Sequence, residues 1–262
     1  MFKYPRTRHV RGSRFQHGDH DMEDVPWEEL TGKHLIIEEK MDGANCGISF
    51  DADHLQLQSR GHYLRGGPRE KHFDLLKQWS SARQVELFDA IGNRYVMYGE
   101  WMAAKHTFFY DALPHYFMEF DILDTETNEF LSTSARREML KNTPCIHPVK
   151  VLAEGKFSDV RVLKSMIVKS YFTTETSRLL HLEEAARAAG VHATDAIEHT
   201  DPSPLMEGLY IKWEEDGIVK GRYKFVRESF TSSIMDQDVH WINRPIIQNR
   251  LLPGAFEAMF SS

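Results

Sequence analysis

The sequence predicts an α+β fold in which antiparallel strands are flanked by helices. Apolar and polar residues alternate along two pairs of strands, and short turns at residues 51–54 and 214–217 join the members of each pair. The second turn contains Asp-Gly, a dipeptide that favours a tight β-hairpin. Over residues 70–91 and 176–189, apolar residues instead recur at helical spacing. Hairpins and helices in one chain therefore predict antiparallel sheets with helices around them.

The first hairpin is built on an apolar strand that ends in charged residues. A strand is expected over residues 34–41, and Asp42-Gly43 interrupts it with a turn. The alternation resumes as far as Phe50, and the return strand ends at Arg60. Hairpin geometry therefore brings Arg60 back towards the end of the first strand.

Weaker signals place the remaining elements. Alternating apolar residues predict strands, apolar residues three and four apart predict helices, and proline or glycine ends either element. These rules predict strands over residues 95–100 and 115–123 and within 144–152, and an irregular segment over 102–111. They predict a helix or a broken pair of helices over 70–91, helices over 158–169 and 176–189, and short helices after residue 235.

Length and composition limit the class of protein. With 262 residues, the chain can bury a substantial core as one large domain or as a domain with an appendage. No apolar run approaches the roughly 20 residues of a membrane span, and no signal peptide is recognisable, so a cytoplasmic protein is expected. Cys46 and Cys145 are too few and too far apart for a disulfide framework or a cysteine zinc site.

Charge is distributed unevenly, with a basic segment in an acidic chain. The formal net charge of −7 argues against nucleic-acid binding over the whole surface, since phosphate contacts need dense lysine and arginine. The N-terminal arm, residues 1–25, is either a solvated terminus or a local RNA contact. Within it, His17–Asp21 could bind a metal, although a polar loop is the simpler interpretation. The arm's basic residues are Lys3, Arg6, Arg8, Arg11 and Arg14, interleaved with Tyr4, His9 and Phe15.

Lys40 is the candidate nucleophile of the chain. It lies in the stretch 38–45, where the first strand gives way to the Asp42-Gly43 turn. Lysine at its ordinary pKa is mostly an ammonium ion, so a reactive lysine needs cationic neighbours or desolvation. Taken alone, this stretch could equally be a solvated strand end followed by a tight turn.

Further stretches follow Lys40 in a recognisable order. They are Ser59-Arg60-Gly61, Tyr98-Gly99-Glu100, residues 117–122, residues 207–212 and residues 222–227. Together with Glu-Lys-x-Asp-Gly-x-Asn around Lys40, they resemble the motifs of the covalent nucleotidyltransferases, which include polynucleotide ligases and mRNA-capping enzymes. The resemblance spans roughly residues 33 to 230. Within the family, the sequence resembles phage-type nick-sealing and RNA-editing RNA ligases more than DNA ligases, because DNA ligases usually have arginine where Asn45 stands.

The resemblance implies a nucleotidyltransferase fold over residues 26–230, with the nucleotide in a cleft between two antiparallel sheets. It implies an ATP-dependent RNA ligase that uses Mg²⁺ or Mn²⁺. Lys40 would attack the α-phosphate of ATP, AMP would pass to an RNA 5′-phosphate, and an RNA 3′-hydroxyl would displace AMP. Glu207 would face the active centre and help to position metal-bound water or the lysine. Lys224 would neutralise the phosphate and lower the pKa of Lys40.

The resemblance also implies a set of nucleotide-binding residues. Glu100 would accept hydrogen bonds from the ribose hydroxyls, and Phe120 would stack on adenine while Phe117, on the opposite strand face, enters the core. Surface or core roles are the simpler alternatives. The guanidinium of Arg60 suits a phosphate. Glu39 and Asn45 would help to bind the nucleotide or would bond to local backbone, and Glu38 is one candidate reader of the adenine edge.

The last motif departs from the family pattern. Two positions after Lys224, where the family has a second lysine, this chain has Val226. Strand alternation places Arg222 on the face of Lys224 and Arg227 on the opposite face. We therefore expect Arg222 to supply the second nucleotide-binding cation, with Arg227 as the alternative.

Several functional questions stay open at this stage. A capping-type guanylyltransferase, which uses the same lysine chemistry with GTP, and a non-catalytic RNA-binding relative are the alternatives to an RNA ligase. After Lys224, 38 residues remain, enough for a short helical tail over residues 231–262. Alignment of RNA ends, whether single-stranded, nicked or in duplex, would then depend on the N-terminal arm, an oligomer or a partner such as an end-healing kinase.

Overall fold

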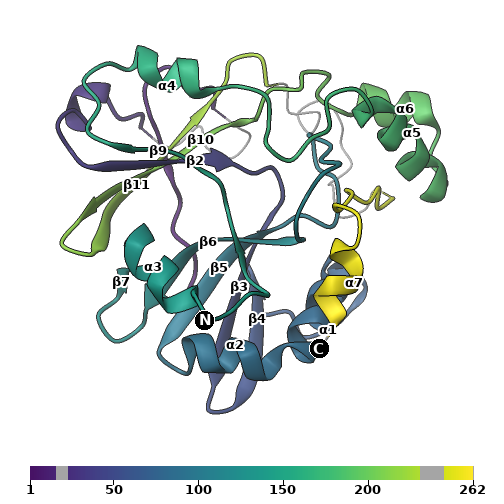
Figure 1. The fold of residues 1–262 in the computed structure, drawn as a ribbon, viewed down its shortest axis with the longest axis horizontal. Helices are drawn as coiled ribbons and strands as arrows, with labels where there is room; N and C mark the ends of the chain where they lie inside the picture. The colour runs from purple at the N-terminus through teal and green to yellow at the C-terminus, as the bar shows by residue number, and fades with distance from the viewer. Residues whose placement is uncertain (16–22, 231–244, 262) are drawn as a thin grey trace.

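Two β-sheets face each other and form the body of the protein, as Figure 1 shows. The structure is a computed structural model and describes residues 1–15, 23–230 and 245–261. The sheet at the top of Figure 1 has the strand order β1-β11-β10-β2-β9, and the lower sheet has the order β4-β3-β5-β6-β7, with β8 beside β6. The α+β class with helices flanking two sheets is therefore confirmed.

The upper sheet is antiparallel except at its β1 edge, where β1 runs parallel to β11. Its central strand β10 pairs with β2 on one side and with β11 on the other. The β10–β11 hairpin turns at Asp216 and Gly217, which both have positive φ, as the Asp-Gly signal predicted. The strands are β1 (Arg8–His9), β2 (Leu35–Lys40), β9 (Val151–Gly155), β10 (Gly208–Glu215) and β11 (Ile218–Val226).

The lower sheet begins with the predicted hairpin and is antiparallel except where β8 runs parallel to β6. All eight residues of β6 are buried, which fits a strand covered on both faces. The strands are β3 (Ala44–Asp51), β4 (His54–Ser59), β5 (Tyr95–Trp101), β6 (Phe117–Asp124), β7 (Glu129–Phe130) and β8 (His147–Pro148).

Helices cover the outer faces and one end of the molecule. The predicted broken pair is present as α1 (Asp74–Ala82) and α2 (Gln84–Ile91), whereas α3 (Thr133–Leu140) was not predicted. None of the helices in the described part of the chain is long and apolar enough to cross a membrane. The remaining helices are α4 (Arg161–Met166), α5 (Arg178–Ala188), α6 (Ala193–Glu198) and α7 (Ala255–Phe260), with 3₁₀ turns at Trp27–Glu29 and Pro68–Phe73.

Much of the core lies between each sheet and the helices that cover it. In the lower layer, Trp79 of α1 stacks on Phe117 of β6, with ring centroids 5.5 Å apart. In the upper layer, Trp27 and Leu163 belong to a second buried cluster with the side chains of β2 and β10. Helices therefore support each sheet from its outer face, and part of the space between the sheets is a cavity.

The described residues of the N-terminal arm, 1–15 and 23–25, are part of the fold and not a solvated terminus. Its β1 pairs with β11, and Val10 and Val25 are fully buried. Its basic side chains Lys3, Arg6, Arg8 and Arg11 are exposed. The residues His17–Asp21, for which metal binding was considered, lie outside the described residues.

The C-terminal segment packs back on the lower layer. Gln248 forms a β-bridge with Ala104, and Leu251 forms one with Leu113, before the chain ends in the short α7. Short helices were predicted after residue 235, and residues 231–244 lie outside the described part of the chain.

Gly208 predicts a stability effect that can be measured. A Cβ atom at this position would lie 2.1 Å from the carbonyl oxygen of Phe225 and 2.8 Å from Cα of Val226, so β10 and β11 would have to separate. We expect Gly208→Ala to destabilise the fold by about 2 kcal/mol, which lowers the melting temperature by roughly 5 °C. Gly61→Ala, with nothing within 4 Å of its added Cβ, is the matched control. Equal melting temperatures for both variants would contradict the close approach.

Candidate active site

Lys40 is the last residue of β2, and the chain turns immediately after it towards the lower sheet. This turn depends on a close approach at Gly43. A Cβ atom there would lie 2.6 Å from Sδ of Met102 and 2.8 Å from the carbonyl oxygen of Trp101. Asp42 fixes the turn further, because its Oδ2 accepts hydrogen bonds from the backbone N–H groups of Thr107 and Phe108 at 2.8 and 2.7 Å. The glycine and the aspartate of the motif therefore both position Lys40.

A cavity of about 600 Å³ opens beside Lys40 and is lined by residues of both sheets. It is large enough for a nucleotide-sized ligand, and mixed polar and aromatic lining is common in such sites. Seven of the nine predicted site residues line it: Glu39, Lys40, Asn45, Arg60, Glu100, Phe120 and Lys224.

Glu207, an eighth predicted residue, does not line the cavity but forms a hydrogen bond with Lys40. Nζ of Lys40 donates a hydrogen bond to Oε1 of Glu207 at 2.6 Å, and the Glu207 side chain is fully buried. The contact follows from register, because Gly208 of β10 lies opposite Lys40 of β2. A buried, charge-assisted hydrogen bond of this length is among the strong ones in proteins.

Carboxylates rather than cations determine the pKa of Lys40. Burial acts to lower this pKa, but the charges of Glu207, Glu100 and Asp42 outweigh burial and raise it above the ordinary value. Burial also raises the pKa of Glu207 to about 7 and that of Glu100 to about 8. In the protein without ligand, the carboxylates therefore determine the direction of the Lys40 pKa shift, and the lowering by Lys224 stays a prediction.

The first motif contains two adjacent glutamates with different surroundings. Glu39 accepts a hydrogen bond from Oγ of Ser170 at 2.5 Å and another from the backbone N–H of Tyr171 at 3.2 Å, and burial raises its pKa to about 7. Glu38 points the other way and pairs with Arg136 and Lys212. Glu39 thus anchors the 170–171 segment at the cavity wall, whereas Glu38, which also lines the cavity, belongs to a buried network of charges.

The lower sheet contributes the residues expected at the base, ribose and phosphate. Phe120 lines the cavity and Phe117 packs on Trp79, as strand alternation predicted. Glu100 lies opposite Asn45 in the β3–β5 pairing. The β3–β4 hairpin brings Arg60 to the cavity because Cys46 is paired with Ser59, the residue before Arg60.

The two candidates for a second cation have other partners. Arg222 stacks on Phe130, with Cζ 3.8 Å from the ring centroid, and it is the one predicted site residue besides Glu207 that does not line the cavity among the described residues. Arg227 donates to the carbonyl oxygen of Met206 at 3.0 Å and forms an ion pair with Asp201. Lys224 is therefore the lysine or arginine of β11 that borders the cavity.

Several lining residues were missed by sequence reasoning. Tyr4 and Thr7 come from the N-terminal arm, His106 from the irregular segment and Tyr210 from β10. Strand alternation could have identified Tyr210, since it shares a face with Lys212 and lies opposite Lys224. The segments that contain Tyr4, Thr7 and His106 have no periodicity, so only the tertiary structure places them.

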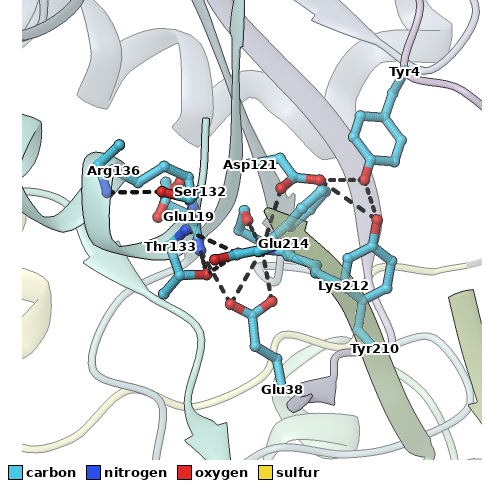
Figure 2. Close-up of polar contacts among 12 residues, drawn as sticks. Tyr4, Glu38, Glu119, Asp121, Ser132, Thr133, Arg136, Tyr210, Lys212 and Glu214 are labelled. Carbon is cyan, nitrogen blue, oxygen red and sulfur yellow. Dashed lines mark hydrogen bonds and ion pairs between the residues drawn. The ribbon is translucent and has the colours of Figure 1, made fainter. Parts of the chain in front are cut away.

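A buried network of charges ties the two sheets together below the cavity (Figure 2). Nζ of Lys212 in β10 lies 2.9 Å from Oε2 of Glu38 and 3.2 Å from Oδ1 of Asp121 in β6, and it also donates to the carbonyl oxygen of Phe120. Arg136 of α3 bridges Glu38 and Glu119. Lys212 and Arg136 therefore link β2 and β10 of the upper sheet to β6 of the lower one.

The carboxylates around Lys40 suit a divalent cation that arrives with phosphate. Among the described residues, no group of three or more histidine, cysteine or acidic side chains is arranged to hold a metal on its own. Glu207 and Glu100 nevertheless have pKa values raised by burial, so a nearby positive charge would stabilise their ionised forms. This donor set fits Mg²⁺ or Mn²⁺ held mainly by substrate phosphates and water.

The fold and this site define the class of protein. Two facing sheets, with Lys40 hydrogen-bonded to Glu207 beside the cavity between them, have the nucleotidyltransferase fold of the RNA ligase structures. A sequence model of the family described as RNA ligase matches residues 33–226. The chain belongs to the RNA ligase family.

Solved structures support the fold assignment. A variant of Naegleria gruberi RNA ligase with ATP and Mn matches with a TM-score of 0.50 and 17% identity, over 78% of this chain and 52% of that one. The same RNA ligase with PPi matches with a TM-score of 0.50 and 16% identity over the same shares. The chain thus spans about half the length of the structures that it resembles. No curated protein sequence matches the chain.

The raised pKa of Glu100 predicts a stability that depends on pH. The folded protein holds a proton on Glu100 up to about pH 8, whereas the unfolded chain releases it near the ordinary value of 4.5. Stability should therefore fall as the pH rises between these values. We expect Glu100→Gln to exceed the wild type in unfolding free energy by at least about 1 kcal/mol at pH 8 and to differ little near pH 5.

Urea unfolding at several pH values measures this difference. Glu28→Gln, which removes an exposed carboxylate, is the control and should follow the wild type. A Glu100→Gln variant whose advantage does not grow with pH would contradict the buried, protonated state of Glu100.

Proposed function

We propose that this protein is an ATP-dependent RNA ligase that joins 5′-phosphate and 3′-hydroxyl RNA ends through a lysyl-AMP intermediate. The observation that carries the proposal is the Lys40 amine, held 2.6 Å from Glu207 at the edge of a cavity between two sheets. Membership of the RNA ligase family and the likeness to a ligase structure with ATP and Mn support it. Such a reaction serves RNA repair and fits a cytoplasmic protein.

Lys40 begins the reaction by forming a bond to the α-phosphorus of ATP. The bond from that phosphorus to pyrophosphate breaks, and pyrophosphate leaves. The amine must first lose a proton, and Oε1 of Glu207 is the acceptor already bonded to it. Burial sets the pKa of Glu207 to about 7, which suits proton exchange near neutral pH. A bound divalent cation would supply charge neutralisation for the leaving pyrophosphate.

The residues around Lys40 then hold the nucleotide for this attack. Phe120 offers a ring face to adenine, and Glu100 offers its carboxyl oxygens to the ribose hydroxyls. Lys224 and Arg60 offer positive charge to the phosphates from opposite sheets. With these charges in place, the carboxylates that hold Lys40 as an ammonium ion gain other partners and the amine is released.

The two remaining steps use RNA as acceptor and as nucleophile. An oxygen of the RNA 5′-phosphate attacks the AMP phosphorus, and the bond to Nζ breaks, which returns the amine to Lys40. An RNA 3′-hydroxyl then attacks the activated 5′-phosphate and AMP leaves. A partner such as an end-healing kinase would supply ends with the required 5′-phosphate and 3′-hydroxyl.

Labelling with α-labelled ATP tests the first step. We expect the wild type to retain label in acid with ATP and not with GTP, and Lys40→Ala to retain none, because the variant lacks the amine that attacks the α-phosphorus. Lys156→Ala, which removes an exposed lysine, should label like the wild type. Stable label from GTP instead of ATP would identify a guanylyltransferase.

Sealing assays with 5′-phosphorylated RNA and DNA ends, single-stranded and in nicked duplexes, test the remaining steps. We expect RNA ends to be joined and Lys40→Ala to be inactive. A protein that labels with ATP but seals only DNA would contradict the RNA ligase assignment.

A further inference from the structure

The first ten residues cross the cleft from one sheet to the other. At one end, the carbonyl oxygen of Phe2 accepts hydrogen bonds from Nε2 of Gln58 at 2.7 Å and from the hydroxyl of Tyr98 at 2.6 Å, both in the lower sheet. At the other end, the backbone N–H of Val10 donates to the carbonyl oxygen of Lys224 at 2.9 Å in the upper sheet. Figure 1 shows the N-terminus beside the lower sheet, and β1 pairs with β11 in the upper sheet.

Between these anchors, the hydroxyl of Tyr4 joins side chains of both sheets (Figure 2). It donates to Oδ2 of Asp121 in β6 at 2.5 Å and lies against the hydroxyl of Tyr210 in β10. The Tyr4 side chain is 4% exposed, and both it and Tyr210 line the cavity. A buried hydroxyl bonded to both walls restricts how far the walls can move apart.

The Tyr4 ring also restrains Phe120. The two rings meet edge to face, with centroids 5.3 Å apart and an angle of 82° between their planes. The ring of Tyr210 also contacts Phe120, with centroids 5.9 Å apart. Edge-to-face contacts of this kind orient an aromatic ring beyond simple burial. The orientation of Phe120 therefore depends on a residue that lies 36 positions before Lys40 in the chain.

We propose that residues 2–10 form a strap that fixes the spacing of the two walls of the nucleotide cleft, with Tyr4 as the positioning residue for Phe120. This inference rests on the proposed function and assigns the N-terminal segment to nucleotide binding. It goes beyond the expectation that the basic arm helps to align RNA ends, because the buried side chain of Tyr4 lines the cavity while the basic side chains of the strap are exposed.

The test is the ATP concentration dependence of lysyl-AMP formation without RNA. We expect Tyr4→Ala to raise the KM for ATP at least about tenfold, since a ring contact and buried hydrogen bonds are lost, while the rate at saturating ATP changes less than about threefold. Tyr4→Phe keeps the ring and loses the hydroxyl, so its KM should rise about threefold. A loss of stability alone would lower the maximal rate through the amount of active protein and leave KM unchanged.

Lys3→Ala, an exposed residue of the same strap, is the control and should keep the wild-type KM. A folded Tyr4→Ala with the wild-type KM would overturn the inference. If thermal melting shows that Tyr4→Ala does not fold, Tyr4→Phe decides, and an unchanged KM overturns it. Wild-type protein that acquires no label from ATP would instead overturn the proposed function, and this inference with it.

Discussion

The ion pair between Lys40 and Glu207 is the interaction on which the rest of the site depends. It joins the last residue of β2 to the residue before β10, the neighbouring strand in the sheet, so it forms only when β2 and β10 keep their register. Gly208 allows the close approach of β11 on the far side, and Gly43 lets the chain turn directly into the lower sheet. The pair therefore requires both a fixed strand register and two positions without a side chain.

Buried charges hold the two sheets at the spacing that this pair needs. Removing two charges from water is costly, and a buried ion pair rarely repays that cost by stability alone. The network around Lys212 and Arg136 nevertheless fixes β6 relative to β2 and β10, which places Phe120 and Lys40 on either side of one cavity. Its main consequence is thus geometric: the sheets face each other in one arrangement.

Local sequence patterns could predict the strands but not the connections between them. Alternation and the two hairpins determined the place of β2, β3, β4, β10 and β11, and with them the positions of Lys40, Arg60 and Lys224. The family motifs led to Glu207, Glu100 and Phe120. Helix α3 was missed because it is short and mostly polar, although Ser132 caps it by accepting a hydrogen bond from the N–H of Ala135.

Properties that depend on distant contacts could not be read from the sequence. Arg222 lies on the predicted face of β11, but its guanidinium stacks on the neighbouring ring of Phe130. The basic composition of residues 1–15 indicated either an RNA contact or a solvated terminus, since no local pattern shows that β11 and Asp121 bind this segment. The upward shift of the Lys40 pKa could not be predicted for the same reason, because three carboxylates from separate segments converge on its amine.

Peptide mapping of the protein after incubation with ATP and Mn²⁺ tests the central claim most directly. Digestion and mass spectrometry should locate AMP on Lys40 and on no other lysine, because this is the amine that the cleft and Glu207 hold in place. AMP on a different lysine, or no AMP on a protein that still joins RNA ends, would contradict the account.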